Sequence, residues 1–276
     1  MTSAPAPLVD THCHLNMAVF EDDLDAVLQR AHEAGITKIL IPGTDFDNSR
    51  RAISLASQNP GIYAAVGFHP HDAKNWTANS HSDLEELAGQ PQVVAIGEIG
   101  LDYHHNYSDP ELQRKVFQDQ LELARELELP VVIHNREAIH DILPLLEQWS
   151  AGLPEPLIGR CGVLHAFSAD QEAASKAIDL GFYIGIAGPI TFRKSDALRD
   201  MVGMLPLERI LTETDAPYMT PDPHRGKRNE PSHVQFITAA IANTRQVDVD
   251  RARDQTAVNA RALFQWNHEI TNSYVL

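Results

Sequence analysis

LVDTHCHL, at residues 8–15, is the first of eight runs that are apolar, rich in β-forming residues and bounded by polar residues, Gly or Pro. The other seven runs begin at residues 37, 62, 93, 130, 161, 182 and 210. Amphipathic helical patterns lie between the runs, for example at 22–35, 110–128 and 171–181. Eight alternations of strand and helix predict an α/β fold, the (β/α)8 or TIM barrel. An open doubly wound sheet is the alternative, but no GxGxxG motif follows a strand to support it.

The domain organisation is predicted to be simple. No internal linker interrupts the 276 residues, so we expect one TIM-barrel domain over 1–276. The Pro-containing stretch at 151–160 is read as a loop before the sixth run, and 249–266 as one more amphipathic helix that closes the outer ring. With 43% apolar and 22% charged residues, the chain can bury a large core.

The charge and the cysteines exclude several classes of protein. A net charge of −16 repels phosphates at long range, which argues against a protein that coats nucleic acid or an anionic membrane. Two cysteines, Cys13 and Cys161, make neither a disulfide framework nor a CxxC pair. The N-terminal residues do not resemble a secretory signal, and the most apolar stretch, 180–192, is too short to span a membrane. We therefore expect a cytoplasmic protein without a membrane partner.

Ionisable residues close several of the apolar runs. In a TIM barrel the active site lies at the carboxyl ends of the strands, so polar residues there are candidates for catalysis. Burying a carboxylate or an imidazole at such a position is costly unless a metal ion or a partner compensates. The candidate metal ligands of this kind are His12, His14, Glu98, His134, His165 and Asp215.

The first run carries a His-x-His pair. Because side chains alternate along a strand, we expect His12 and His14 to face the barrel mouth with Asp10 one layer below, while Thr11 and Cys13 face the helices. Asp10 is expected to hold a ligand imidazole by its far nitrogen. Alone, the pair is equally well explained as two hydrogen-bonded histidines in a polar pocket; the other strand ends favour a metal site.

The type of ligand limits the metal. Nitrogen and oxygen ligands without thiolate suit one or two divalent cations such as Mg²⁺, Mn²⁺ or Zn²⁺. Six ligands exceed the need of one open catalytic ion, and Glu98 is the natural bridge between two. Glu98 and Asp215 are the candidate catalytic residues, with Asp215 expected to orient or deprotonate the attacking water.

Several sequence blocks carry a family resemblance. DTHCHL, GFHPH, GEIGLDY, VVIHNREA, LHAFS, ETDAPY, RGKRNEP and TAVNARALF follow one another along nearly the whole chain. In order and spacing they resemble the TatD family of metal-dependent deoxyribonucleases, within the amidohydrolase-like barrels. Many relatives read HCFSG where this chain has HAFSA at 165–169, which keeps the histidine but changes the loop after it.

The resemblance implies metal ligands and an activity. It implies that His12, His14, Glu98 and Asp215 bind one ion, and that Glu98, His134 and His165 bind a second. It implies hydrolysis of phosphodiester bonds in DNA, with 3′ to 5′ exonuclease activity on single strands. The expected partner is therefore a DNA substrate, and a single-stranded end in particular.

A basic loop follows the eighth run. RGKRNEP, residues 225–231, places three positive charges in four residues, and loops after strands seven and eight are the usual phosphate site of this barrel. A short basic run elsewhere would be read as a solvated loop. In the resembling family, Arg228 and Asn229 fall in a motif associated with substrate binding.

Three further residues are candidates for substrate binding. Arg136 stands two residues beyond His134 and suits a phosphate clamp, although a salt bridge to Glu137 or Asp102 is the alternative. His69 and His71 end the third run, where they either orient phosphate or a leaving group or simply pack in the loop.

The predicted function is therefore metal-dependent hydrolysis of DNA. Hydrolysis of an ester, an amide or an aminoacyl ester is the alternative, because similar ligand sets also serve attack on carbonyl carbon and the fold does not separate the two. A metal-dependent binding module without turnover is a third possibility, and the complete set of candidate ligands speaks against it.

Overall fold

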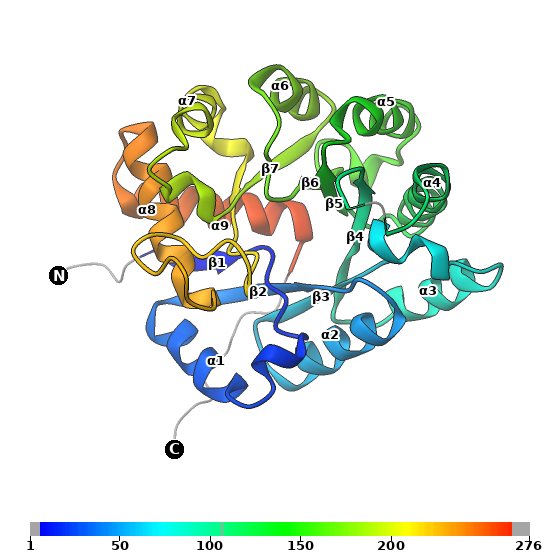
Figure 1. The fold of residues 1–276 in the computed structure, drawn as a ribbon, viewed down its shortest axis with the longest axis horizontal. Coiled ribbons are helices and arrows are strands. Elements are labelled where there is room, and N and C mark those ends of the chain that lie inside the picture. The colour runs from blue at the N-terminus through cyan, green and yellow to red at the C-terminus, as the bar shows by residue number, and fades with distance from the viewer. Residues whose placement is uncertain (1–5, 106, 267–276) are drawn as a thin grey trace.

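The computed structural model describes residues 6–105 and 107–266, and its centre is one sheet of eight parallel strands in the order β1 to β8 (Figure 1). The strands are β1 Leu8–Asp10, β2 Ile36–Pro42, β3 Ile62–Val66, β4 Val93–Asp102, β5 Val131–Arg136, β6 Gly162–Leu164, β7 Phe182–Ile186 and β8 Ile210–Thr212. A helix precedes each next strand, which confirms the predicted single-domain TIM barrel.

Of the nine helices within the described residues, eight surround the sheet and α9 lies across one end of it (Figure 1). They are α1 Leu24–Glu33, α2 Phe46–Gln58, α3 Ser80–Ala88, α4 Pro110–Glu126, α5 Ile139–Ser150, α6 Gln171–Asp179, α7 Asp196–Met204, α8 Val234–Arg245 and α9 Val249–Phe264. Short 3-10 helices occupy Ala18–Phe20, Pro70–Asn75, Glu155–Leu157, Gly188–Thr191, Leu207–Arg209 and Pro231–His233.

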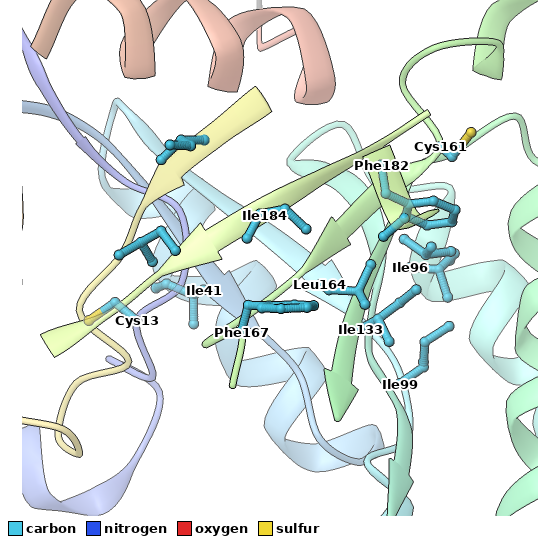
Figure 2. Packing of buried hydrophobic residues seen from close by; sticks show 14 of the residues in the cluster. Cys13, Ile41, Ile96, Ile99, Ile133, Cys161, Leu164, Phe167, Phe182 and Ile184 are labelled. Carbon is cyan, nitrogen blue, oxygen red and sulfur yellow. The ribbon is translucent and has the colours of Figure 1, made fainter. Parts of the chain in front are cut away.

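The strands alternate between two apolar layers. Val9, Leu40 and Leu211 belong to an inner cluster inside the barrel, which Leu263 and Phe264 of α9 complete. The prediction that this last helix joins the outer ring is therefore wrong: its apolar face covers the amino-terminal end of the barrel interior. The second layer lies between strands and helices, and Figure 2 shows its members Ile96, Ile133, Leu164 and Ile184 on neighbouring strands.

Aspartates begin several of the helices. Asp45, Asp109, Asp170 and Asp248 each accept a hydrogen bond from a backbone N–H in the first turn of α2, α4, α6 and α9 respectively. A carboxylate at this position satisfies an orphan donor and interacts favourably with the helix dipole. Part of the negative charge of the chain therefore stabilises the first turns of helices.

Within the described residues, no helix is both long and apolar enough to cross a membrane.

The barrel closes through residues that follow β1 and β8. The backbone N–H of Thr11 donates to the carbonyl of Thr212 at 3.1 Å, and that of Asp215 donates to the carbonyl of His12 at 2.9 Å. Cys13 and Ala216 then form an isolated parallel bridge. The segments that carry His12, His14 and Asp215 are thus held together by the closure of the barrel itself.

Candidate metal centre

His134 and His165 project into the barrel mouth because of strand alternation. Val132 of β5 and Val163 of β6 belong to the inner cluster, so the residues two positions later share their direction. The approach of β5 to β4 is close here, since a Cβ added at Gly100 would lie 2.1 Å from the carbonyl oxygen of His134. Glycine at this position lets the two strands meet beside the imidazole.

A bulge in β4 turns Glu98 into the mouth. Ile96 pairs with Val131 and Ile99 with Ile133, so between these two pairs β4 advances by three residues while β5 advances by two. Ile96 and Ile99 both lie in the outer layer, and simple alternation would have sent Glu98 toward the helices as well. The extra residue reverses the direction of the side chain, which is the usual effect of a bulge beside a functional site.

The two oxygens of Glu98 face different pairs of histidines. Oε1 lies 2.9 Å from Nδ1 of His134 and 2.8 Å from Nε2 of His165. Oε2 lies 3.3 Å from Nε2 of His12 and 3.6 Å from Nε2 of His14. A carboxylate between two imidazole pairs has the arrangement of a bridging ligand.

Asp215 completes the set around His12 and His14. Its Oδ1 lies 3.4 Å from Nε2 of His14 and 3.7 Å from Nε2 of His12, while the two Nε2 atoms are 3.2 Å apart. Asp215 adopts a positive φ of 54°, a conformation that is strained for a residue other than glycine. The closure of the barrel holds this strained residue where its carboxylate meets both imidazoles.

The site fits divalent cations. His12, Glu98, His165 and Asp215 are all at most 6% exposed, and nitrogen and oxygen donors converge from several strand ends. Buried polar groups of this density are costly unless a ligand compensates them. All six predicted metal ligands therefore meet in one buried cluster that suits one or two divalent ions.

Protonation within the cluster favours cation binding at the His12 side. Burial lowers the pKa of His12, so this imidazole is neutral. Burial raises the pKa of Glu98, but the surrounding histidines, His165 foremost, outweigh it and hold that pKa well below its usual value. Burial also raises the pKa of Asp215, but its hydrogen bond to His14 and the nearby histidines lower it overall. Neutral imidazole and ionised carboxylate are the forms that bind metal.

At the other side of Glu98, protons compete with a cation. Burial lowers the pKa of His165, yet the carboxylates of Glu98 and Glu213 raise it overall to well above its usual value. Burial also lowers the pKa of His134, but the hydrogen bonds that this imidazole donates to Asp102 and Glu98 raise its pKa overall. A cation that binds here must displace these protons, so its affinity falls as the solution becomes more acidic.

Two carboxylates behind the ligands were missed as site residues by the sequence reasoning. Asp102 Oδ2 lies 3.3 Å from Nε2 of His134, and Glu213 Oε1 lies 3.6 Å from Nδ1 of His165. Each faces the ring nitrogen opposite to the one that meets Glu98, so each can orient an imidazole. Glu213 stands two residues beyond Leu211 of the inner cluster, and this alternation was a signal that could have found it.

The role predicted for Asp10 is wrong. Its carboxylate accepts from the backbone N–H and the hydroxyl of Thr214, at 2.9 and 2.6 Å, and from the backbone N–H of His12 at 3.3 Å. Among the residues that the structure describes, no imidazole nitrogen donates to it. β1 ends at Asp10, and its residue Leu8 belongs to the outer layer, so Asp10 shares that direction. Burial raises the pKa of Asp10 to about 8. Asp10 therefore joins the ends of β1 and β8.

Thr11 and Cys13 were both expected to face the helices. The hydroxyl of Thr11 instead donates to the carbonyl of Thr212 at 3.1 Å and lies 3.4 Å from Glu213, so this prediction is wrong. Cys13 does pack in the outer layer, as predicted (Figure 2). The alternation fails at Thr11 because the chain bends after the short β1.

Arg228 lies away from the mouth. Its guanidinium donates two hydrogen bonds to Asp23, at 2.9 and 2.7 Å, and a third to the carbonyl of Val19, and it stacks over Phe20. A guanidinium held in this way by a carboxylate is not presented to a phosphate. The structure thus places the predicted substrate-binding residue in an ion pair that anchors the loop after β8.

Asn229, the other loop residue predicted to bind substrate, is fully buried. Its amide donates to the carbonyls of Thr214 and Tyr218, at 2.8 and 2.6 Å, and its oxygen accepts from the backbone N–H of Glu230 at 2.9 Å. These carbonyls flank Asp215 along the chain. The amide therefore fixes the segment that presents Asp215.

The remaining three candidates do line the cavity above the cluster. This cavity has a volume of about 1310 Å³, and His69, His71 and Arg136 belong to its wall. His69 Nε2 lies 3.6 Å from Glu98 Oε1, and burial holds the pKa of His69 well below its usual value. Among the described residues, the exposed guanidinium of Arg136 pairs with no carboxylate, so neither predicted salt bridge forms.

A TIM barrel that gathers imidazoles and carboxylates at the carboxyl ends of its strands defines a metal-dependent hydrolase. Residues 9–265 match the family described as TatD related DNase, and the chain belongs to this family. Its relatives include an uncharacterized metal-dependent hydrolase, YabD, of Bacillus subtilis, 38% identical over 94% of this chain and 100% of that protein. The 3′-5′ ssDNA/RNA exonuclease TatD of Salmonella typhimurium is 38% identical over 94% of this chain and 99% of that protein.

A solved structure supports the same assignment. The crystal structure of YjjV, a TatD homologue from Escherichia coli, matches with a TM-score of 0.86 and 33% identity, covering 94% of this chain and 98% of that one. The predicted family and fold are therefore confirmed, and the protein is a TatD-family metal-dependent hydrolase with buried clusters suited to divalent metals.

Proposed function

We propose that the protein hydrolyses phosphodiester bonds and removes nucleotides from the 3′ end of single-stranded DNA. The observation that carries the proposal is Glu98, whose two oxygens face separate histidine pairs at the base of an open cavity. A relative named as a 3′-5′ ssDNA/RNA exonuclease, alike over nearly its full length, supports the choice of substrate.

The candidate ligands divide into two sets that share Glu98. His12, His14 and Asp215 would hold one cation, and His134 and His165 would hold the other. Divalent cations bound there would polarise the phosphoryl group and make water a stronger nucleophile near neutral pH. Glu98 would keep the two sets in one fixed geometry, because the bulge and the strand ladder on both sides of it are buried.

The chain supplies the proton acceptor and the phosphate contact. The carboxylate of Asp215, which meets the Nε2 atoms of His12 and His14, would orient the attacking water and accept its proton. Arg136, exposed at the end of β5 and free of a carboxylate partner among the described residues, would hold a phosphate oxygen. Neutral His69, beside Glu98, would orient the scissile group.

The net charge of −16 agrees with a small active site rather than a DNA-coating surface. The basic loop at 225–231 does not line the cavity, and Arg228 is paired with Asp23. Only a few phosphates at the end of one strand would therefore be held, mainly by the cations and Arg136. We expect weak binding of DNA when divalent cations are absent.

The test uses single strands labelled at either end. The purified protein is incubated with Mg²⁺, Mn²⁺ or Zn²⁺ and with 3′-labelled or 5′-labelled DNA, the matching RNA, or a carboxylic ester. We expect the 3′ label to be released as mononucleotide while the 5′-labelled strand shortens stepwise. Glu98→Gln, which keeps the size but loses the charge, should be inactive. Hydrolysis of the ester alone, or shortening from the 5′ end, would contradict the proposal.

A further inference from the structure

A second group of metal-binding side chains lies on the cavity wall, outside the set around Glu98. It consists of His71, in the 3-10 helix after β3, Asp102, the last residue of β4, and His105, three residues later. We call these three residues the rim cluster. All three line the cavity; the Asp102 side chain is 1% exposed, while those of His71 and His105 are 28% and 37% exposed.

More nitrogens converge on Asp102 than hydrogen bonds can satisfy. Oδ1 already accepts from the backbone N–H groups of His104 and His105, both at 2.9 Å. Oδ2 is approached by Nε2 of His71 at 2.7 Å, Nδ1 of His105 at 3.0 Å and Nε2 of His134 at 3.3 Å. A carboxylate oxygen offers two lone-pair sites, so three imidazole donors cannot all be well placed on it.

The three ligand atoms lie within reach of one shared cation. In a tetrahedral zinc site with bonds of about 2.0–2.1 Å, neighbouring ligand atoms lie roughly 3.3 Å apart. The rim distances of 2.7 and 3.0 Å are hydrogen-bond distances, like the 2.8 and 2.9 Å from His165 and His134 to Glu98, so a cation would require the ligand atoms to separate by roughly 0.3–0.6 Å. One ligand atom from each of the three rim residues lies within 4.8 Å of the others.

We propose that the rim cluster is a separate binding site for a divalent first-row cation, with Zn²⁺ as the preferred ion. Nε2 of His71, Oδ2 of Asp102 and Nδ1 of His105 would be its ligands. Two imidazoles and one carboxylate leave a fourth tetrahedral position, which faces the cavity and is open to water or to an anionic oxygen. Asp102 would then link this ion to His134 of the main cluster.

Metal content tests the proposal without any assay of activity. Zinc bound per chain is measured after equilibrium dialysis for the wild type, for the double variant His71→Gln/His105→Asn, and for the control variant His104→Asn. His104 is adjacent in sequence but faces Glu137, at 2.8 Å, and takes no part in the rim cluster. Crystals soaked in Zn²⁺ are examined by anomalous diffraction at the zinc edge.

The expected result is a difference of one zinc per chain. The wild type and His104→Asn should each bind one equivalent more than the double variant, and an anomalous peak should lie between His71 and Asp102 in crystals of the wild type but not in crystals of the double variant. Equal zinc in all three proteins, or equal loss in His104→Asn, would overturn the proposal. If the double variant is unfolded in chelator, the single variants His71→Gln and His105→Asn are measured instead. Each should bind the additional zinc ion more weakly than the wild type does. A failure to cleave DNA would bear only on the proposed function.

Discussion

Replacing Asn229 with alanine should damage the metal centre without removing a group that touches substrate. The amide of Asn229 holds the carbonyls of Thr214 and Tyr218, at 2.8 and 2.6 Å, on either side of Asp215 along the chain. Alanine would leave both carbonyls without this donor. Each buried group left unsatisfied costs about 1–3 kcal/mol, so we expect a loss of about 2–6 kcal/mol in the free energy of unfolding.

A second asparagine provides a matched control. Asn259 of α9 is also buried, and its amide donates to the carbonyls of Leu207 and Ile210, both at 2.8 Å, at the start of β8. Asn259→Ala should therefore cost a similar free energy of unfolding. Because these carbonyls lie at the end of β8 away from the cluster, we expect metal affinity and catalysis to be preserved.

The assay compares stability with metal binding in both variants. Unfolding of the chelated proteins by urea gives the stability change, and titration with Mn²⁺ or Zn²⁺ gives the affinity. Asn229→Ala should lose about 10–100-fold in metal affinity or kcat, as is typical when a group that orients a ligand is removed. If Asn229→Ala kept its stability and metal affinity and raised only KM for DNA, Asn229 would be a substrate contact and our reasoning would be refuted.

Three further predictions follow from the same contacts. Glu213→Gln should weaken metal binding by about 10–100-fold, because it removes the charge that faces His165; an unchanged titration curve would contradict this role. Chelation should lower the Tm of the wild type in calorimetry, because a cation at 100 times its Kd stabilises the folded state by about 2.7 kcal/mol. The Tm of Glu98→Gln should be the same with and without chelator. The hydrogen bond from Arg228 lowers the pKa of Asp23 below 3.8, so the stability from this pair is present above pH 3.8 and is lost as the pH falls through the lowered value. Wild type and Asp23→Asn should thus differ in urea unfolding at neutral pH and converge in acid; a constant difference would count against the pair.

The sequence was sufficient to predict the barrel and the convergence of the candidate metal ligands at its mouth. Runs of apolar residues determine the strand count, and ionisable residues at their carboxyl ends must converge when parallel strands close into a barrel. His134 and His165 follow this rule directly. Glu98 reaches the same place through a bulge, which a pattern of alternating residues does not reveal.

The sequence did not predict the partners of Arg228 and Asn229, because position along the chain does not determine where a loop side chain points. Arg228 and Asn229 follow β8, as expected, but one meets Asp23 and the other meets backbone carbonyls. These partners are more than ten residues away or belong to loops, so no periodic pattern indicates them. Arg136 lies on a strand, and the strand ladder carries its backbone to the cavity as predicted.

Anomalous diffraction from crystals of the metal-loaded protein would test the central claim most directly. We predict two peaks at the main cluster, each about 2.0–2.2 Å from a different oxygen of Glu98. One should lie among His12, His14 and Asp215, and the other beside His134 and His165. Cations bound elsewhere in the barrel mouth would contradict the account. So would a structure in which Glu98 contacts no cation or only one of the two.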